Sequence, residues 1–281
     1  MFVQGNGRRL TLDKVRVMGI LNMTPDSFSD GGHFNGLDKA LFHAESMIAA
    51  GVDIIDIGGE STRPGAAEVS ETEELERVLP VIEKIVSRFD IFVSVDTSRP
   101  RVMTAAAAAG VHLINDVRAL ELPGALQACS ETGLPVCLMH MRGSPASMQE
   151  GPRYQDPVLD IIEYLQERVN VCMQAGIGAN RLLIDPGFGF GKTLDHNLAL
   201  LARLKEFKSL QLPVLVGMSR KTMIGDILNT PVSERMVGSV AAAVIAAMNG
   251  ADIVRVHDVK ESVEAIKVFN AQQPWQKNQE K

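Results

Sequence analysis

The sequence predicts an α/β fold, a (β/α)8 TIM barrel with an N-terminal β-hairpin. Eight runs of β-branched and apolar residues end on polar groups, with room for a helix between most of them. The end points lie 19 to 45 residues apart, at Asn22, Asp56, Asp96, Asn115, His140, Asp185, Ser219 and His257. Because parallel strands in such a barrel collect their carboxyl ends on one face, we expect these polar residues to form one site.

The first elements have clear local signals. Asn6-Gly7 favours a tight turn, so residues 1–14 are expected to form a hairpin that closes the bottom of the barrel. The first barrel strand is expected at residues 15–21, and a helix at residues 37–50 that ends at the following glycine.

Later helices carry start signals. Residues 70–73 (Ser-Glu-Thr-Glu) form a capping box, and Pro100 and Pro157 suit the first turn of two further helices. Residues 234–248 are rich in Ala and Val around a glycine and predict a helix that packs closely against a partner surface. That helix favours a homodimer.

Composition agrees with one enzyme domain over residues 1–281, with a tail from 271 to 281. No Gly-, Ser- or Pro-rich linker divides the chain, and barrels of this class commonly have about 250 residues. The net charge of -6 argues against nucleic-acid and anionic-membrane partners, which need an excess of Lys and Arg. The 3 cysteines lack a CxxC pair, and no signal or membrane-spanning pattern is present. We therefore expect a cytoplasmic protein.

Two long segments follow the first two strands. Residues 23–36 include Phe28 and residues 58–70 include Arg63, and both segments are dense in Gly, Ser, Asp and Pro. Loops over the carboxyl ends of barrel strands concentrate substrate contacts, so both segments are expected to contribute to the site.

The polar groups at the strand ends form an unusual mixture. The carboxylates need partners, and a metal cluster is one candidate, but Asn115, Lys221, Arg255 and His257 suit a polar heterocycle with an anion better. Carboxylates, an amide and an ammonium group complement an aminopyrimidinone edge. Arg255 and His257, two residues apart on one strand, share a face and can clamp phosphate. Asp56 and Asp116 are each assigned either a supporting or a structural role.

Two glycine-rich or basic segments invite a phosphate-site interpretation. GFGFGKT at residues 187–193 fails as a phosphate loop, because Pro186 stands where the first Gly is required, and it predicts a turn with Phe190 as a stacking wall. A helix beginning near Thr222 would direct free backbone N–H groups at an anion. His140 is a base, a metal ligand or a residue paired to a neighbour.

Specific strings also carry a resemblance to a known family. MGILNMTPDSFSDGG, DIIDIGGESTRPGA, SVDTSRP, INDVRAL, LMHMRG, LLIDPGFGFGKT, LVGMSRKTMIG and IVRVHDVKE resemble, in order, the motifs of the bacterial dihydropteroate synthase family. The match extends from about Val17 to Glu261. The resemblance implies a transferase of folate biosynthesis that condenses 6-hydroxymethyl-7,8-dihydropterin diphosphate with 4-aminobenzoate, with Mg²⁺ on the diphosphate, and that is a target of sulfonamide inhibitors.

The resemblance also assigns roles to individual residues. The pterin would be held by Asp96, Asn115, Asp185, Lys221 and Arg255. The diphosphate would be received by Asn22, Thr62, Arg63, Arg255 and His257, with Asn22 as the Mg²⁺ ligand. The 4-aminobenzoate pocket would be formed by Phe28, Thr62, Pro64, Phe190, Ser219 and Thr222. Catalysis would rest on Asp96, Arg63, Lys221, Arg255 and His257.

Three other functions remain open at this point. A pterin-binding barrel that transfers a methyl group to a corrinoid would share the pterin residues but has no need for the anion clamps. A synthase altered to evade sulfonamides should differ around Phe28 and Pro64. A purely binding or structural barrel has no reason to hold so many unlike charged groups at one end.

Overall fold

The computed structural model describes residues 1–23, 32–60, 69–143 and 152–277 of the 281-residue chain. Its main sheet is parallel, with the strand order β8-β7-β6-β5-β4-β3-β10-β9. The strands are β3 (Arg16–Asn22), β4 (Ile54–Gly58), β5 (Phe92–Asp96), β6 (Leu113–Asp116), β7 (Val136–Met139), β8 (Leu182–Asp185), β9 (Leu215–Val216) and β10 (Ile253–Val256).

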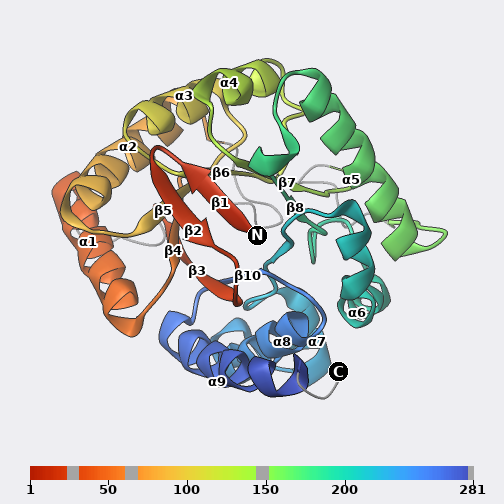
Figure 1. The fold of residues 1–281 in the computed structure, drawn as a ribbon. Helices are drawn as coiled ribbons and strands as arrows, with labels where there is room; N and C mark the ends of the chain where they lie inside the picture. Colours follow the sequence, from red (N-terminus) through yellow and green to blue (C-terminus); the bar gives the residue numbers. More distant parts are fainter. Residues whose placement is uncertain (24–31, 61–68, 144–151, 278–281) are drawn as a thin grey trace.

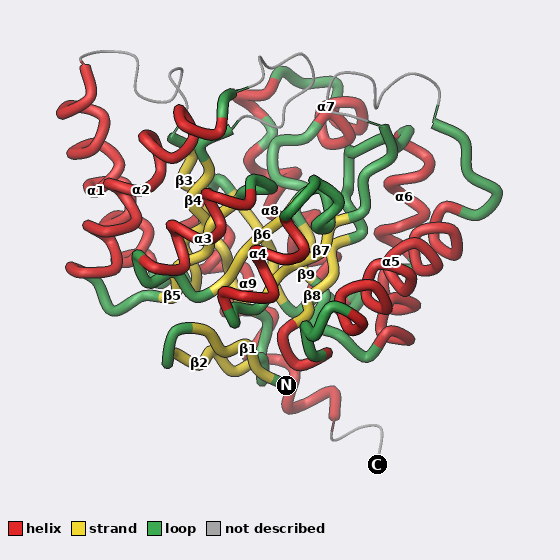
Figure 2. The backbone as a smooth tube through the Cα atoms, turned by 90° about the horizontal axis from the view of Figure 1, so that it is seen from above, coloured by secondary structure: helices red, strands yellow, loops and turns green. Residues whose placement is uncertain are grey.

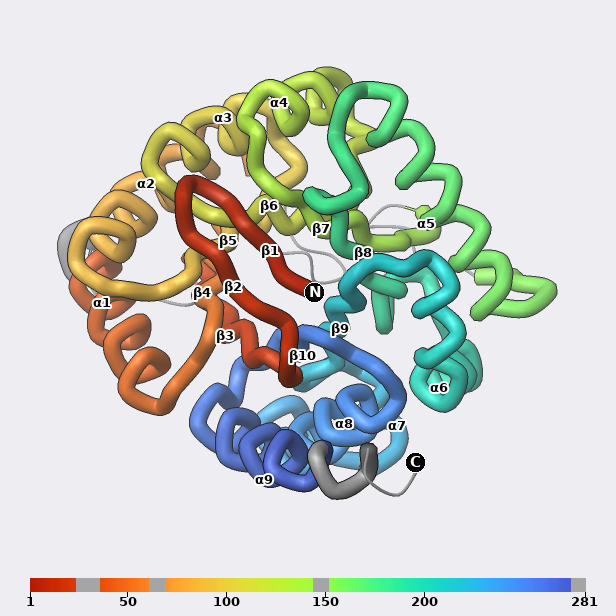
Figure 3. Tube along the Cα trace, viewed as in Figure 1, coloured from red at the N-terminus to blue at the C-terminus, as the bar shows by residue number. Residues whose placement is uncertain are grey.

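The two outer strands of this order approach each other and nearly close the sheet. Ile184 of β8 forms a parallel bridge with Val214, just before β9, and the Ile184 N–H donates to the carbonyl of Pro213 at 3.0 Å. Figure 3 shows β8 and β9 on the same side of the ring of strands. The predicted barrel is therefore confirmed.

Helices surround the strands as an outer ring (Figure 1). They are α1 (Gly32–Ala50), α2 (Glu71–Arg88), α3 (Pro100–Ala108), α4 (Ala125–Thr132), α5 (Pro157–Gln174), α6 (Leu194–Ala202), α7 (Thr222–Leu228), α8 (Met236–Met248) and α9 (Val259–Lys277). Short 3-10 turns occur at Ala179–Arg181, Leu204–Leu210 and Val232–Glu234. Across the described ranges, no helix combines the length and apolar character needed to cross a membrane.

The hairpin β1 (Phe2–Gly5) and β2 (Arg8–Thr11) closes the amino end of the barrel, as predicted. Its turn residues Asn6 and Gly7 have φ of 42° and 77°. Figure 2 shows the hairpin at one end of the strands and α7 at the other. The apolar layer that the hairpin covers consists of Val3, Leu12, Met18, Ile54, Phe92, Leu113, Cys137, Leu183, Leu215 and Ile253.

Most predicted helix boundaries are close to the observed ones, with three corrections. Pro100 and Pro157 occupy the first turn of α3 and α5 as predicted. However, α1 begins at Gly32 rather than at residue 37, and α8 begins at Met236, because a 3-10 turn occupies the residues before it. The predicted capping box is half formed.

The two halves of that box behave differently. The Ser70 hydroxyl accepts from the Glu73 N–H at 3.2 Å. The Glu73 carboxylate does not complete the reciprocal bond and instead accepts from Arg77, one turn further along α2. An ion pair within the helix therefore takes the place of the second capping bond.

The alternation of side chains along each strand places polar groups inside the barrel. On β4, Ile54 belongs to the inner apolar layer, whereas Ile55 and Ile57 pack toward the helices, so Asp56 points inward one step above Ile54. Asp56 was predicted at a strand end and instead lies within β4, which continues to Gly58. The same alternation directs inward Asp56, Ser94, Asn115, Asp185 and Arg255.

Candidate active site

Arg255 connects two carboxylates inside the carboxyl end of the barrel. Its Nε donates to Asp56 Oδ2 at 2.6 Å, and its Nη2 donates to Asp96 Oδ2 at 2.6 Å. The Asn115 side-chain amide also donates to Asp56 Oδ2, at 3.1 Å. Four strands thus contribute to one hydrogen-bonded group of two carboxylates, one guanidinium and one amide.

The electrostatics of this group follow from its composition. Burial raises the pKa of Asp96 to about 7, opposed by the charge of Arg255 and reinforced by the like charge of Asp56. Burial acts to lower the pKa of Arg255, but Asp56 and Asp96 outweigh it, so the pKa is raised and the guanidinium stays charged. One cation thus lies among more acidic groups than it can neutralise, which suits a ligand rich in N–H donors.

Gly58 leaves room between two further predicted site residues. The strand register aligns Asn22, Gly58 and Asp96 across β3, β4 and β5. A Cβ atom on Gly58 would lie 3.6 Å from Asn22 Oδ1 and 3.7 Å from Asp96 Oδ2. The amide oxygen of Asn22 and the carboxylate of Asp96 therefore lie on either side of Gly58 on the inner surface of the barrel.

Lys221 and Asp185 form a second charged group. The Lys221 ammonium donates to the Phe188 carbonyl and lies 4.4 Å from the centroid of the Phe190 ring. Burial lowers the pKa of Lys221 to about 8, with Asp185 opposing the shift. Burial raises the pKa of Asp185, with Lys221 as the main opposing charge, and Asp185 Oδ1 accepts from the Gly187 N–H at 2.7 Å. Phe190 is buried, Lys221 covers one face of its ring, and its role as a stacking wall remains a prediction.

Ser219, Thr222 and His257 lie near the ends of β9, α7 and β10. The Ser219 hydroxyl accepts from the His257 N–H at 3.1 Å and contacts His257 Nδ1 at 3.1 Å. Ser219 was predicted at a strand end, but β9 stops at Val216, so Ser219 lies in the turn that follows. Thr222 is the first residue of α7, as predicted.

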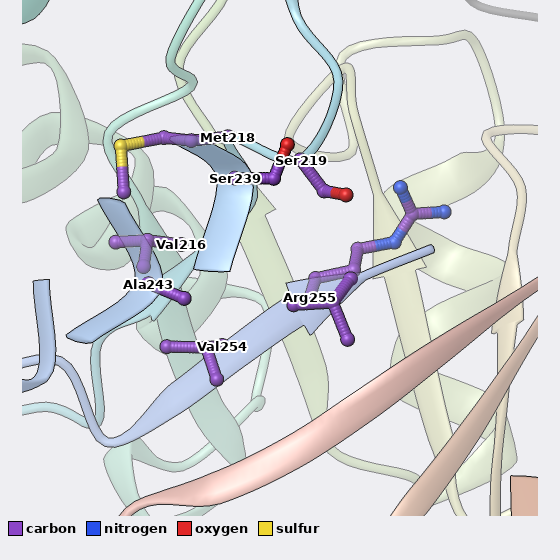
Figure 4. Close-up of a pocket in the computed structure, with 8 residues that line it drawn as sticks. Val216, Met218, Ser219, Ser239, Ala243, Val254 and Arg255 are labelled. Carbon is purple, nitrogen blue, oxygen red and sulfur yellow. The ribbon is translucent and has the colours of Figure 1, made fainter. Parts of the chain in front are cut away.

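A small cavity beside these residues belongs to the packing between β9, β10 and α8. It has a volume of about 10 Å³, which is enough for about one water molecule. Figure 4 shows that the guanidinium group of Arg255 points away from Val216 and Ala243. The charged end of Arg255 is therefore directed to the group described above rather than into this cavity.

The GFGFG segment is a turn with a structural requirement for glycine. Gly187, Gly189 and Gly191 have φ of 70°, 81° and 64°. A Cβ atom on Gly187 would come within 1.9 Å of the His140 carbonyl oxygen. The backbone conformation thus accounts for the glycines, in agreement with the rejection of a phosphate loop.

Lys192 is a buried residue that the sequence did not single out. Its ammonium donates to the carbonyls of Gly187 and Phe190 at 2.8 and 2.9 Å and contacts His140 Nδ1 at 2.9 Å. Burial and the Lys192 charge lower the pKa of His140 to about 2, so the imidazole is neutral. Of the three roles open for His140, pairing to a neighbour is the one observed. The position of Lys192 directly after the glycine-rich segment was a signal in the sequence, but the sequence pattern does not reveal that its side chain is buried.

Asp116 has a structural role. Its carboxylate accepts from the Ser98 hydroxyl, from the Arg118 N–H at 2.9 Å and from the Leu120 N–H at 2.7 Å. It thereby stabilises the turn after β6, in which Ala119 and Leu120 have positive φ. Asp56, by contrast, contacts two predicted site residues.

Four predicted site residues, Phe28, Thr62, Arg63 and Pro64, lie outside the described residues. Their roles at the diphosphate and 4-aminobenzoate remain predictions. Among the residues that are described, no cluster of three or more His, Cys, Asp or Glu side chains could hold a metal ion.

Comparisons with known proteins identify the family of this chain. A sequence model of the family described as pterin binding enzyme matches residues 18–257. A dihydropteroate synthase from Escherichia coli K12 is 60% identical over 96% of this chain and 95% of its own length, and one from Haemophilus influenzae is 52% identical over 96% and 98%.

Solved structures give the same result. The dihydropteroate synthase of Yersinia pestis, in complex with a sulfonamide drug, has 59% identity and a TM-score of 0.93, covering 98% of this chain and 100% of its own. That of Xanthomonas albilineans with 4-aminobenzoic acid has 48% identity and a TM-score of 0.91, covering 97% and 99%. The chain therefore belongs to the pterin-binding enzyme family and, within it, to the dihydropteroate synthases.

Proposed function

We propose that this chain joins 6-hydroxymethyl-7,8-dihydropterin diphosphate to 4-aminobenzoate, forming 7,8-dihydropteroate and releasing pyrophosphate. As a dihydropteroate synthase, the chain is a transferase of folate biosynthesis. The observation that carries the proposal is the convergence of Asp96, Asn115, Arg255 and Asp56 inside the carboxyl end of the barrel.

The pterin subsite is proposed at that convergence. Asp96 and Asp185 accept from the N–H groups of the pterin edge, Asn115 both donates and accepts, and Lys221 donates to the ring carbonyl oxygen. The Arg255 guanidinium lies against the ring face. Burial of these groups supports the proposal, because a polar heterocycle would supply the partners that water supplies elsewhere.

The diphosphate subsite is proposed to include Arg255, His257 and Asn22, together with Thr62 and Arg63. Mg²⁺ would be held by Asn22 Oδ1, an oxygen ligand that this ion accepts, with substrate oxygens completing the shell. The position of Asn22 Oδ1 next to Gly58, on the same inner surface as Asp96 Oδ2, supports this assignment. When bound, Mg²⁺ would neutralise charge that develops on the leaving pyrophosphate.

The 4-aminobenzoate pocket is proposed at Ser219, Thr222 and Phe190, with Phe28, Thr62 and Pro64. The benzoate carboxylate would lie near the start of α7 and the amine would face the pterin methylene. The sulfonamide in the Yersinia pestis structure and the 4-aminobenzoic acid in the Xanthomonas albilineans structure support small arylamine ligands for this pocket.

The chemistry requires little acid–base assistance from the protein. Arg255, Arg63 and His257 stabilise the negative charge on the leaving pyrophosphate. The Asp96 carboxylate stabilises positive charge that develops on the pterin methylene as the C–O bond lengthens. The arylamine nitrogen then forms the new C–N bond and gives its proton to solvent.

A pyrophosphate-release assay tests this function. The purified protein, with Mg²⁺ and the pterin diphosphate, should release pyrophosphate only slowly alone and rapidly once 4-aminobenzoate is added. A corrinoid methyltransferase or a purely binding barrel would show no such dependence. Absence of 4-aminobenzoate-dependent release would contradict the proposed reaction.

The value of kcat/KM should fall at both acid and alkaline pH. The active state needs Asp96 ionised, with a pKa of about 7, and Lys221 protonated, with a pKa of about 8. Measured against pH, kcat/KM for the pterin diphosphate should therefore fall below about 7 and above about 8, since this parameter reports the free enzyme. A profile that stays flat through both values would show that neither group is required in this state.

We also propose a homodimer that forms through α7 and α8. Large apolar side chains are exposed there and on the turn between them, at Ile227, Leu228, Val232, Met236, Val237, Ile245 and Met248. Several large apolar side chains exposed on two helices in contact are typical of a protein interface. The buried free cysteines, in turn, support a reducing compartment, and we propose the cytoplasm.

Val237→Lys should shift the dimer to monomer, because the substitution places a charge among these exposed apolar side chains. Light scattering after size-exclusion chromatography measures the mass. Val268→Lys is the matched control, since Val268 on α9 is 75% exposed and Val237 is 73% exposed. Equal masses for the two variants would move the interface away from α8.

A further inference from the structure

In the proposed function Asp56 is assigned no contact with either substrate, yet it contacts two of the residues assigned to the pterin, Asn115 and Arg255. It lies within β4, points into the barrel and is 0% exposed. We propose that Asp56 is a positioning residue that fixes the orientation of the Asn115 amide and the Arg255 guanidinium in the pterin subsite. This inference rests on the proposed function, because it concerns groups that would bind the pterin.

The Asn115 amide shows the first effect. An ionised carboxylate can only accept hydrogen bonds, so Asp56 requires the amide nitrogen of Asn115 to face it. The Asn115 carbonyl oxygen and its second N–H are then directed elsewhere, in a defined order. Rotation of the amide by half a turn would exchange a donor for an acceptor at the pterin edge, and Asp56 disfavours that rotation.

Arg255 shows the second effect. Asp56 accepts from Nε and Asp96 accepts from Nη2, so two different carboxylates define the plane of the guanidinium. With Asp96 alone, the group could rotate about a single hydrogen bond. A stacking surface is useful only when its plane is held, and two separate acceptors hold it.

Stability alone does not explain this carboxylate. Oδ2 of Asp56 accepts two hydrogen bonds, whereas Oδ1 is buried and has no hydrogen-bond partner among the described residues. A buried ion pair with an unsatisfied oxygen commonly costs stability relative to apolar packing. The geometry is better suited to orienting two neighbours than to stabilising the barrel.

Asp56→Asn tests the proposal with little change in volume. The new amide no longer forces the orientation of Asn115, and Arg255 loses one of its two charged acceptors. We expect the Kd and KM for the pterin diphosphate to rise about tenfold or more, while the KM for 4-aminobenzoate stays within about twofold. A merely structural role would lower the melting temperature and the yield of active enzyme and would leave both KM values unchanged.

Asp116→Asn is the matched control. Asp116 is also 0% exposed and is the residue after Asn115, but its carboxylate accepts from Ser98, Arg118 and Leu120. This variant should lose stability without a change in the KM for the pterin diphosphate. An equal rise of that KM in both variants would overturn the specific role of Asp56.

A double-mutant cycle tests whether Asp56 acts through its neighbour. Asp56→Asn and Asn115→Ala, made together, should weaken pterin binding less than the product of the two single effects, by about fivefold or more. Independent, multiplicative effects would contradict the proposal. If Asp56→Asn does not fold, the wild-type protein decides, because the Arg255 Nε–H and the Asn115 amide protons should exchange slowly with solvent in ¹⁵N NMR spectra.

The outcomes for the two proposals are separable. A wild-type protein without 4-aminobenzoate-dependent pyrophosphate release refutes the proposed function. An active wild type, together with an Asp56→Asn variant whose pterin KM is within about twofold of normal, or fast exchange of both side-chain groups in the wild type, refutes the role of Asp56 alone.

Discussion

Arg255→Lys should lower kcat/KM for the pterin diphosphate by about a hundredfold, although the substitution conserves charge. Arg255 reaches Asp56 with Nε and Asp96 with Nη2, both at 2.6 Å. A lysine has one terminal nitrogen and no planar face, so it can satisfy one carboxylate and cannot stack on the pterin ring. The second carboxylate stays buried without the charged donor that Arg255 supplies, which should also lower the free energy of unfolding by about 1 to 3 kcal/mol.

Steady-state pyrophosphate release and thermal denaturation measure the two effects. Arg16→Lys is the control, because Arg16 also bridges two aspartates, Asp13 at 2.7 Å and Asp53 at 3.0 Å, at the amino end of the barrel. We expect its kcat/KM to stay within about twofold of wild type. Wild-type turnover by Arg255→Lys would exclude both the stacking role and the bridging role of Arg255.

The barrel was predictable because its signals are local and repeated. Each strand is a short apolar run, and the residue two positions beyond an inward apolar residue also points inward, as from Leu183 to Asp185 and from Leu113 to Asn115. A sequence pattern of this kind establishes which face a residue occupies. It also brings together residues that end different strands, because parallel strands in a barrel share one carboxyl face.

The partners of each polar residue were not predictable in the same way. Asp56 and Arg255 are 199 positions apart, and they meet because β4 and β10 pair with the two sides of β3. The burial of Lys192 depends on the path of the glycine turn and on His140, which is 52 positions away. Side chains from distant strands meet at angles that no local pattern records, so the sequence predicted which strand residues face the interior better than it predicted their hydrogen bonds.

Asp185→Asn should raise the Kd for the pterin diphosphate by about tenfold to a hundredfold while the fold survives. The variant can still accept from the Gly187 N–H, which Asp185 Oδ1 does at 2.7 Å, so the turn after β8 is retained. The second carboxylate oxygen of Asp185 is replaced by an NH2 group, and the side chain loses its negative charge. A pterin N–H that faces this group is then left without a good acceptor. Calorimetric titration with the pterin diphosphate measures the loss.

The same substitution should lower the pKa of Lys221. Asp185 is the largest influence that keeps the pKa of Lys221, about 8, from falling further. Without that negative charge Lys221 should lose its proton at lower pH, so the alkaline fall of kcat/KM should move to lower pH in Asp185→Asn. Asp252→Asn is the control, because Asp252 accepts from the Val214 N–H at 2.7 Å at the amino end of the barrel. Asp252→Asn should reduce stability without changing either the Kd for the pterin diphosphate or the pH profile. A near-normal Kd in Asp185→Asn would remove Asp185 from the pterin subsite.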